Sequence, residues 1–347
     1  MIGEDRTIGV IGAGAWGTAL AQMLSSDGRD VILWAYETDV VEAINREHRN
    51  PLYLPGTELS GSVRATGDLD DLAALDIALV VTPAQVLGSV LANLPARSGD
   101  RPLRDLVLCS KGIEAGTGRL MNDVARSACP DATIAVLSGP TFAHEVASGL
   151  PTAVTLACEG GSEQWERLSP AIARRTFRPY FSDDVTGAEI GGAIKNVLAI
   201  GCGVVDGLAL GQNARAALIA RGFSEMLRFG EALGARAETL SGLCGLGDLV
   251  LTCSSTSSRN FSLGKALGEG RSAAELMADR TTVAEGAHTA PVLADLARKH
   301  DIAMPIVTAV EAILGGQAPR ETVAELLARP LKAERLQWAG DETDTNG

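Results

Sequence analysis

The chain has 347 residues, of which 46% are apolar and only 4% aromatic, so we expect globular domains with aliphatic cores. That length suits about two domains. The formal net charge of −13 argues against nucleic acid and anionic membrane surfaces as partners, so an anionic small molecule would need a locally built basic pocket.

Six cysteines are spread along the chain without a C-x-x-C pair, and the four histidines form no metal-ligand pattern. Free thiols in a reducing compartment are the simplest interpretation, and we expect no bound metal. The acidic start, MIGEDRTIGVIG, runs straight into a predicted strand and does not resemble a signal peptide. We therefore expect a cytoplasmic protein.

The first half of the chain alternates short apolar runs with helical segments, which indicates a parallel, doubly wound α/β sheet. Strands buried on both faces read as continuous apolar runs. On this basis we predict strands over Thr7–Ile11, Val31–Ala35, Val63–Ala65, Ile77–Thr82, Leu106–Ser110, Thr133–Ser138, Thr152–Ala157 and Phe177–Phe181. Helices are predicted at Trp16–Ser25, Val40–Arg46, Ala84–Asn93 and Leu120–Ala128.

After about residue 186 the strand-like runs stop, and the remaining segments read as helices separated by Gly, Pro and Ser/Thr clusters. They are Ala188–Gly207, Arg215–Leu233, Phe261–Leu267, Ala273–Ala278, Ala287–Lys299, Ile306–Leu314 and Glu321–Ala328. We therefore predict a Rossmann-like dinucleotide-binding domain over residues 1–186, an all-α substrate domain over 187–338, and a disordered polar tail over 339–347.

A glycine motif, Gly12-Ala-Gly14-Ala-Trp-Gly17, lies between the first predicted strand and helix. Glycines there permit a tight turn and close approach of the backbone to a pyrophosphate, and the helix N-terminus supplies N–H groups for the phosphates. About 20 residues on, the second strand ends at Tyr36-Glu37. An acid there usually binds the ribose 2′-hydroxyl of NAD.

Glu37 has a second interpretation, as a solvated loop charge beside Tyr36. No arginine stands at either position to receive a 2′-phosphate, so the sequence favours NAD over NADP.

Two further predicted strands end in polar residues, and ligands of such sheets bind outside the carboxyl ends of the strands. Lys111 follows one strand and is either placed over the crevice or an ordinary surface lysine. The turn after another strand offers the Gly139 backbone and the Thr141 hydroxyl to a polar ligand. Alternatively, Thr141 caps the next helix.

Lys195 is the only cation in the apolar run GAEIGGAIKNVLAIGCGVVDGLALG. The run approaches membrane-spanning length, but its polar residues and glycines argue against insertion. An ammonium is costly to desolvate unless it meets an anionic or strongly polar group. A core lysine predicts a carboxylate partner, whereas a catalytic lysine predicts open space at its tip. The small neighbours on its helix face suit either a ligand or a closely packed helix.

Two loops are candidates to complete a site around Lys195. One, LCGLGD, ends in Asp248, and the other, TCSSTSSRN, ends in Ser258, Arg259 and Asn260. Hydroxyls and backbone N–H groups beside an arginine suit a phosphate dianion, although a Ser/Thr-rich run on its own also fits a flexible linker.

Together these segments resemble the bacterial type of NAD(P)-dependent glycerol-3-phosphate dehydrogenase. The matching blocks run in order along nearly the whole chain: GAGAWGTALA, SKGIE, LSGPTFAHEVA, EIGGAIKNVLAIG, GLGDLVLTC, SSRN and VAEG. The resemblance implies reduction of dihydroxyacetone phosphate to sn-glycerol 3-phosphate, a glycerophospholipid precursor, with NAD(H) or NADP(H).

The resemblance also implies residue roles, with Lys195 as the catalytic residue. The implied substrate-binding residues are Lys111, Gly139, Thr141, Lys195, Asp248, Ser258, Arg259 and Asn260. The implied cofactor contacts, beyond the glycines, Tyr36 and Glu37, are Ala15, Trp16, Lys111, Ala143, Arg259, Val283 and Glu285. The family often has serine at the position of Ala15 and a basic residue near Tyr36, and both departures bear on cofactor preference.

In this interpretation Lys195 stabilises the developing oxyanion and donates its proton, because apolar surroundings lower a lysine pKa toward neutrality. Asp248 orients the ligand or Lys195, Asn260 and Thr141 bind polar substrate atoms, and Arg259 clamps the phosphate.

Two alternatives stay open at this point. A related β-hydroxyacid-type dehydrogenase would take a carboxylate substrate, although the Ser258–Asn260 loop with Lys111 favours phosphate. A dinucleotide sensor without turnover would leave Lys195 unexplained. We also expect a homodimer, because helical domains with many Gly/Ala faces often pack against a copy of themselves.

Overall fold

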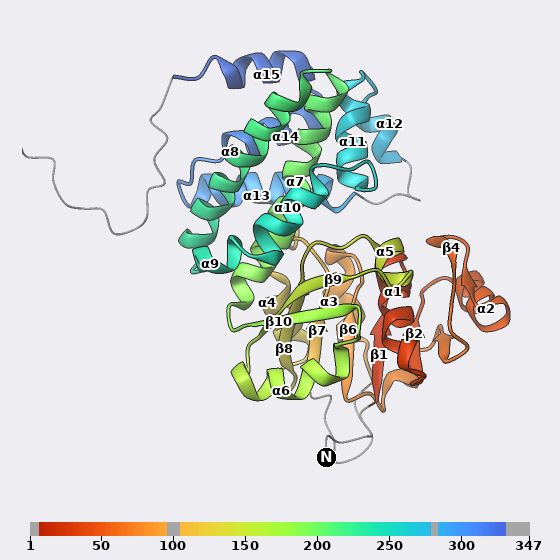
Figure 1. Ribbon diagram of the computed structural model, residues 1–347. Coiled ribbons are helices and arrows are strands. Elements are labelled where there is room, and N and C mark those ends of the chain that lie inside the picture. Colours follow the sequence, from red (N-terminus) through yellow and green to blue (C-terminus); the bar gives the residue numbers. More distant parts are fainter. Residues whose placement is uncertain (1–6, 96–104, 279–283, 331–347) are drawn as a thin grey trace, which may run out of the picture.

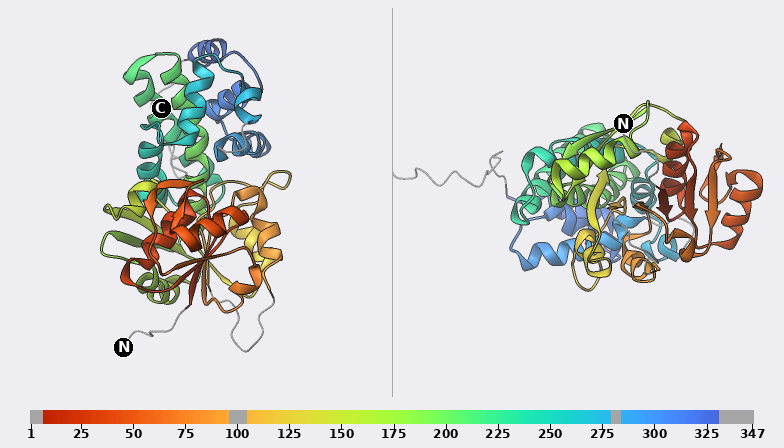
Figure 2. Two further views of the ribbon diagram at one scale, coloured as in Figure 1. Left: turned by 90° about the vertical axis from the view of Figure 1, so that its right-hand side faces the viewer. Right: turned by 90° about the horizontal axis from the view of Figure 1, so that it is seen from below.

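The computed structural model describes residues 7–95, 105–278 and 284–330. Figure 1 shows two layers of architecture, with a twisted sheet and its helices below and a group of helices above. The left view of Figure 2, turned by 90° about the vertical axis, shows the same stacking. The predicted fold class, a Rossmann-like sheet followed by an all-α part, is confirmed.

One eight-stranded sheet organises the first part, in the order β10-β9-β8-β7-β6-β1-β2-β5. All eight predicted strands are present: β1 (Ile8–Ile11), β2 (Val31–Trp34), β5 (Val63–Thr66), β6 (Ile77–Val80), β7 (Asp105–Leu108), β8 (Thr133–Ser138), β9 (Thr152–Cys158) and β10 (Phe177–Ser182). The helices around it are α1 (Ala15–Leu24), α2 (Thr38–Glu47), α3 (Ala84–Ala92), α4 (Met121–Ala128), α5 (Ala143–Ala147) and α6 (Gly161–Ile172).

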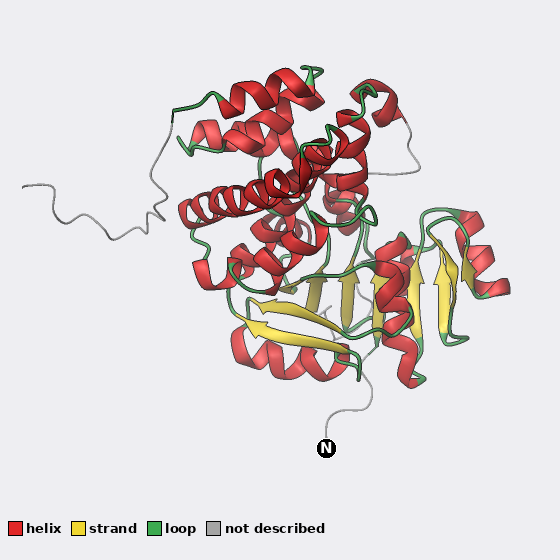
Figure 3. Ribbon diagram, turned by 45° about the horizontal axis from the view of Figure 1, so that its top comes forward, coloured by secondary structure: helices red, strands yellow, loops and turns green. Residues whose placement is uncertain are grey.

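The expectation of a wholly parallel sheet is wrong at one junction. β8 and β9 pair antiparallel, with Ser138 opposite Thr155, and β10 then runs parallel to β9. The connection between β8 and β9 contains only the short α5, which packs on α1 and β4, so the chain re-enters the sheet in the opposite direction. Figure 3 shows these two strands lying across the direction of the others.

A small hairpin of β3 (Arg49–Asn50) and β4 (Leu54–Glu58) was not expected from the sequence. Asn50 is buried in it, and its Nδ2 donates to the Ala13 carbonyl and to Thr18 Oγ1, both at 2.8 Å. Because Ala13 belongs to the glycine loop, this side chain holds the hairpin directly on the predicted cofactor site.

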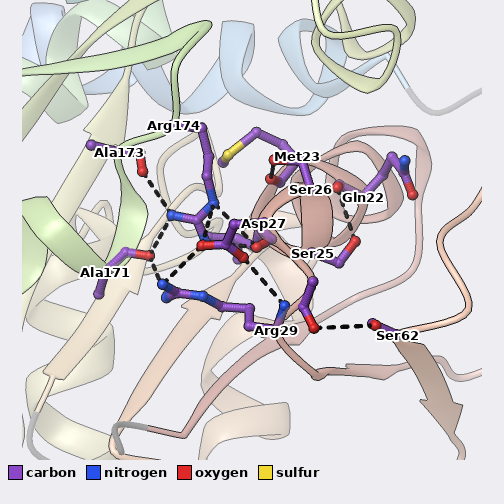
Figure 4. Close-up of polar contacts among 12 residues, drawn as sticks. Gln22, Met23, Ser25, Ser26, Asp27, Arg29, Ser62, Ala171, Ala173 and Arg174 are labelled. Atoms are coloured by element: carbon purple, nitrogen blue, oxygen red, sulfur yellow. Dashed lines mark hydrogen bonds and ion pairs between the residues drawn. The ribbon is translucent and has the colours of Figure 1, made fainter. Parts of the chain in front are cut away.

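A buried arginine ties two helix ends together beside this sheet (Figure 4). Arg174 donates to the Leu24 carbonyl at the end of α1 and to the Ala171 and Ala173 carbonyls at the end of α6. Asp27 lies 3.4 Å from its Nε. Burial, and then the charge of Arg29, lower the pKa of Arg174 to about 10. The guanidinium satisfies carbonyls that helix termini leave free.

The second part is built around α7 (Val185–Gly207), which is long and apolar enough to cross a membrane but whose apolar window is entirely buried in the protein. Glycines let its neighbours approach closely: a Cβ on Gly203 would lie 2.0 Å from the Phe261 carbonyl oxygen. The surrounding helices are α8 (Gly211–Ala232), α9 (Ala237–Leu240), α10 (Asp248–Thr252), α11 (Arg259–Gly268), α12 (Ala273–Ala278), α13 (Glu285–Lys299), α14 (Pro305–Leu314) and α15 (Pro319–Leu327). The predicted tail at 339–347 lies outside the described residues.

Candidate active site

One buried carboxylate joins two lysines from different parts of the chain. Lys195 Nζ lies 2.5 Å from Asp248 Oδ1, and Lys111 Nζ lies 2.8 Å from Asp248 Oδ2. Asp248 is fully buried, Lys195 is 5% exposed, and the Lys111 side chain is 17% exposed. Lys111 follows β7, so the cluster forms where the carboxyl edge of the sheet meets the helices. The carboxylate partner expected for a core lysine is therefore present.

The two lysines differ in their electrostatics although they share one carboxylate. Burial lowers the pKa of Lys195 to about 7, since Asp248 opposes the shift only in part and the nearby charge of Lys111 adds to it. For Lys111, burial also lowers the pKa, but Asp248 more than offsets it and leaves the pKa raised. One lysine thus keeps its proton at neutral pH while the other can release it.

The geometry of this cluster depends on small residues in α7. A Cβ on Gly191 would lie 2.5 Å from the Cys244 carbonyl oxygen, so this position packs against the π-helical turn Leu243–Gly247 that precedes Asp248. A Cβ on Gly192 would meet Ser138 Oγ at 3.2 Å and the Lys111 side chain at 3.3 Å. Of the two explanations for the small residues, close packing accounts for Gly191.

Thr252 also belongs to the cluster, although it was not among the predicted site residues. Its hydroxyl accepts from Lys195 Nζ at 3.1 Å and donates to Asp248 Oδ1 at 3.3 Å. Both contacts follow from α10, which places Asp248 and Thr252 four residues apart on one face. The spacing of four residues between Asp248 and Thr252 could have indicated that the two side chains lie together. That inference requires a helix at this place, and α10 was not predicted.

The turn after β8 places Gly139 and Thr141 near this edge of the sheet. Gly139 is buried, and a Cβ there would lie 2.9 Å from Val154 Cα. Thr141 Oγ1 donates weakly to the Gly139 carbonyl at 3.4 Å. The N-cap of α5 is Phe142, so the alternative role of Thr141 as the helix cap is wrong.

The Ser258–Asn260 segment forms the N-terminus of α11 instead of a flexible linker. Ser258 is the N-cap, and its Oγ accepts from the Phe261 N–H at 3.2 Å. Asn260 Nδ2 donates to Asn196 Oδ1 at 3.0 Å, and its Oδ1 accepts from the Gly286 N–H at 2.9 Å. Asn260 therefore connects α11 to α7 and α13, while Arg259 is exposed at the helix start, where an anion is favoured.

The glycine loop between β1 and α1 fits a dinucleotide. Gly12 has φ +113°, and a Cβ on Gly17 would lie 1.8 Å from the Gly12 carbonyl oxygen, so both positions need glycine. A Cβ on Gly14 would meet nothing within 4 Å, which leaves open space in front of the α1 N-terminus. Ala15 and Trp16 form the first turn of α1, are half-buried, and flank that space.

The other predicted cofactor contacts are distributed around the two parts of the chain. Tyr36 is 84% exposed, and Glu37 is half-buried, its Oε1 accepting from Tyr53 Oη at 2.7 Å. The Glu37 carboxylate therefore has a partner within the protein, and its role at the ribose stays a prediction. Burial raises the pKa of Glu285 to about 7, although the charge of Arg259 and a hydrogen bond with the backbone of Ala84 lower it in part. Ala143 begins α5, and Val283 lies outside the described residues.

Comparison with known proteins gives the same family from both halves of the chain. The family model for the N-terminus of NAD-dependent glycerol-3-phosphate dehydrogenase matches residues 7–164. The family model for its C-terminus matches residues 184–325. The chain belongs to the NAD-dependent glycerol-3-phosphate dehydrogenase family. A relative from Novosphingobium aromaticivorans, named glycerol-3-phosphate dehydrogenase (NAD(P)+), is 73% identical over 94% of this chain and 98% of its own length.

A relative of the same name from Erythrobacter litoralis is 72% identical over 94% of this chain and 97% of its own. The crystal structure of glycerol-3-phosphate dehydrogenase from Coxiella burnetii superposes with a TM-score of 0.88 at 40% identity, covering 94% of this chain and 99% of that one. Family membership confirms the predicted enzyme class, an oxidoreductase acting on a CH–OH group, and NAD(H) or NADP(H) as cofactor. It disfavours the alternative of a sensor without turnover.

Proposed function

We propose that this chain reduces dihydroxyacetone phosphate to sn-glycerol 3-phosphate, with Lys195 as the proton donor. A carboxylate partner alone also suits a core lysine. The observation that carries the assignment of Lys195 is that Asp248 is shared with a second cation, Lys111, so excess positive charge lies at the carboxyl edge of the dinucleotide-binding sheet. This edge is where the ligands of such sheets bind.

When bound, the nicotinamide supplies a hydride to the carbonyl carbon, and the electrons of the C=O bond move to its oxygen. Lys195 Nζ stabilises that oxygen as charge develops and transfers a proton to it, which completes the alcohol. A pKa of about 7 suits both directions, because Lys195 is an acid for reduction and a base for oxidation.

Other side chains bind and orient the substrate in this proposal. Lys111, which keeps its proton, contributes a fixed positive charge beside the reacting oxygen. Arg259 and the N–H groups of the first turn of α11 bind the phosphate, a role that suits a planar guanidinium at a helix N-terminus. Thr252 and Asp248 orient the Lys195 ammonium. Gly139 and Thr141, in the turn after β8, would contribute from the same carboxyl edge of the sheet.

We further propose a cytoplasmic homodimer. The first half of α8 supports an interface, because Ala216, Ala217 and Ala220 are exposed on it and Leu210, just before it, is 42% exposed. Small apolar side chains on a helix face permit close packing against a second copy. Light scattering at micromolar concentration is expected to give twice the chain mass, and a monomer would contradict the dimer.

The function is tested by adding NADH or NADPH to the protein with a panel of ketones. We expect rapid cofactor oxidation with dihydroxyacetone phosphate and identification of sn-glycerol 3-phosphate as the product. Ketones that carry a carboxylate in place of the phosphate are expected to react at least about a hundredfold more slowly, because they leave the phosphate-binding groups unpaired. Faster turnover of a carboxylate ketone would favour the β-hydroxyacid-type alternative.

A further inference from the structure

A groove of about 470 Å³ lies between α14 and α15, which pack against each other. Figure 1 shows both helices in the upper part of the molecule, with α15 at the end that faces away from the sheet. The residues that α14 contributes to the groove are Pro305, Thr308, Ala309 and Ala312. Because they are three or four residues apart, they form one continuous face of the helix, and three of the four are apolar.

The facing side of the groove has the same spacing on α15. The residues that α15 contributes are Thr322, Glu325, Leu326 and Arg329. Thr322 is buried and Leu326 packs on the hydrophobic core, whereas Glu325 and Arg329 are exposed. The groove therefore has an apolar floor and a charged rim, which is the kind of surface that accepts a peptide segment with apolar side chains.

The described part of the chain ends beside this groove. Arg329 lines it, and Pro330 is the last residue before residues 331–347, which lie outside the described ranges. The large apolar side chains of that segment, Leu331, Leu336 and Trp338, all fall within its first eight residues, and the remainder, AGDETDTNG, has none.

The segment over residues 331–338 is long enough to reach every part of the groove. Eight residues span at most about 29 Å when they are extended. The ten residues of α14 form a helix only about 15 Å long. The chain can therefore turn back after Pro330 and lie along α14 without being stretched.

We propose that residues 331–338 bind in the groove between α14 and α15 of the same chain, with Leu331, Leu336 and Trp338 against its apolar floor. A tether that begins at the rim gives this segment an effective concentration in the millimolar range, whereas a separate partner loses its full translational freedom on binding. The cations Lys332 and Arg335 complement the exposed Glu325 carboxylate.

Limited digestion of the full-length protein with trypsin tests the proposal, because Lys332 and Arg335 are cleavage sites within the segment. Mass spectrometry measures the rate at each site, with a synthetic peptide of residues 331–347 as the reference. We expect cleavage in the protein to be at least about tenfold slower than in the peptide, since a bound segment is cleaved only when it opens.

Ala309→Glu places a carboxylate on the apolar floor of the groove, so it is expected to increase cleavage at both sites at least about fivefold. Ala324→Glu is the matched control, because Ala324 lies exposed on α15 and does not line the groove. The same substitution there is expected to leave both rates unchanged. Circular dichroism checks that the two variants fold.

A second test needs no substitution in the groove. A chain that ends at Pro330 is expected to unfold about 2–6 °C below the full-length protein, because it lacks the apolar side chains that bind the groove. A chain that ends at Trp338 is expected to unfold within about 1 °C of the full-length protein.

Cleavage of the full-length protein at the rate of the peptide would overturn the proposal, as would equal unfolding temperatures for the chains that end at Pro330 and Trp338. Protection that disappears on dilution would also overturn it, because the groove would then hold the segment of a second copy. None of these measurements uses a ketone or a cofactor, so they are independent of the proposed reaction.

Discussion

Two buried aspartates in this protein meet their cations in opposite ways. Asp105, at the start of β7, is bound by Arg167 through two hydrogen bonds of 2.8 Å and by Gln164 Nε2 at 3.0 Å. The planar guanidinium matches one carboxylate, so the charges balance. Asp248 is shared between Lys111 and Lys195, so one negative charge faces two ammonium groups.

The difference separates a structural ion pair from a reactive one. A balanced pair gives neither partner a reason to release a proton, and the pKa of Arg167 is raised. An unbalanced pair of lysines can reach neutrality only by losing a proton or by binding an anion. Burial lowers the pKa of Lys195, and the second ammonium, that of Lys111, lowers it further. The same missing negative charge favours the binding of a phosphorylated substrate.

The largest expected effect comes from removing the excess cation. Lys195→Met leaves Lys111 and Asp248 as a balanced pair, like Arg167 and Asp105. We expect the rate of hydride transfer in a single turnover to fall by about 10²–10⁴, which is the usual contribution of a general acid. The unfolding temperature is expected to be no lower than that of the wild type, because the substitution removes a buried cation.

A rate within about tenfold of the wild type would show that Lys195 does not supply the proton. Arg167→Met, which removes a cation of the other pair, is the matched control for the stability measurement. It is expected to unfold at a lower temperature, because it leaves Asp105 buried without its cation.

The second prediction concerns the two buried carboxylates, Asp105 and Asp248. Asp105→Asn and Asp248→Asn each remove one buried negative charge and keep the side-chain shape. Asp105→Asn breaks the balanced pair with Arg167 and is expected to lower the free energy of unfolding by about 3–5 kcal/mol. The kcat of the folded enzyme is expected to stay unchanged. In Asp248→Asn we expect kcat to fall at least about a hundredfold, since Lys195 loses the group that orients it.

Stability in Asp248→Asn is expected to change less than in Asp105→Asn, because Lys195 can become neutral whereas a guanidinium cannot. Urea unfolding and steady-state kinetics on the same preparations provide both quantities. If Asp248→Asn retained its activity, or if Asp105→Asn lost it, the division between structural and reactive pairs would be wrong.

The sequence predicted the members of the site better than their contacts. Lys195 was recognisable because a lone cation in an apolar helix needs a partner, and the glycine motif was recognisable because its spacing follows from the turn. The contact of Asp248 with Lys195 was one of the two roles expected for Asp248. Its simultaneous pairing with Lys111 was not predictable, because the two contacts join positions 53 and 137 residues apart. Such contacts depend on how the helices pack, which no local pattern specifies.

The hairpin was missed for a related reason. β3 has two residues and β4 contains Pro55 and Gly56, so neither shows the alternating or continuous apolar pattern of a strand. Its position is determined instead by Asn50, which bonds to the glycine loop. The antiparallel direction of β9 was equally invisible, because a buried strand has the same apolar pattern in either direction.

The pH dependence of kcat/KM for reduction of dihydroxyacetone phosphate tests the central claim most directly. Reduction needs the protonated form of Lys195, whose pKa is about 7. The phosphate of the substrate, with a second pKa of about 6, is already a dianion above neutral pH and does not obscure the result. We predict that kcat/KM falls about tenfold per pH unit above pH 7, and that oxidation of the product rises through the same pKa. If kcat/KM for reduction stayed constant between about pH 6 and pH 9, Lys195 would not be a proton donor whose pKa burial has lowered.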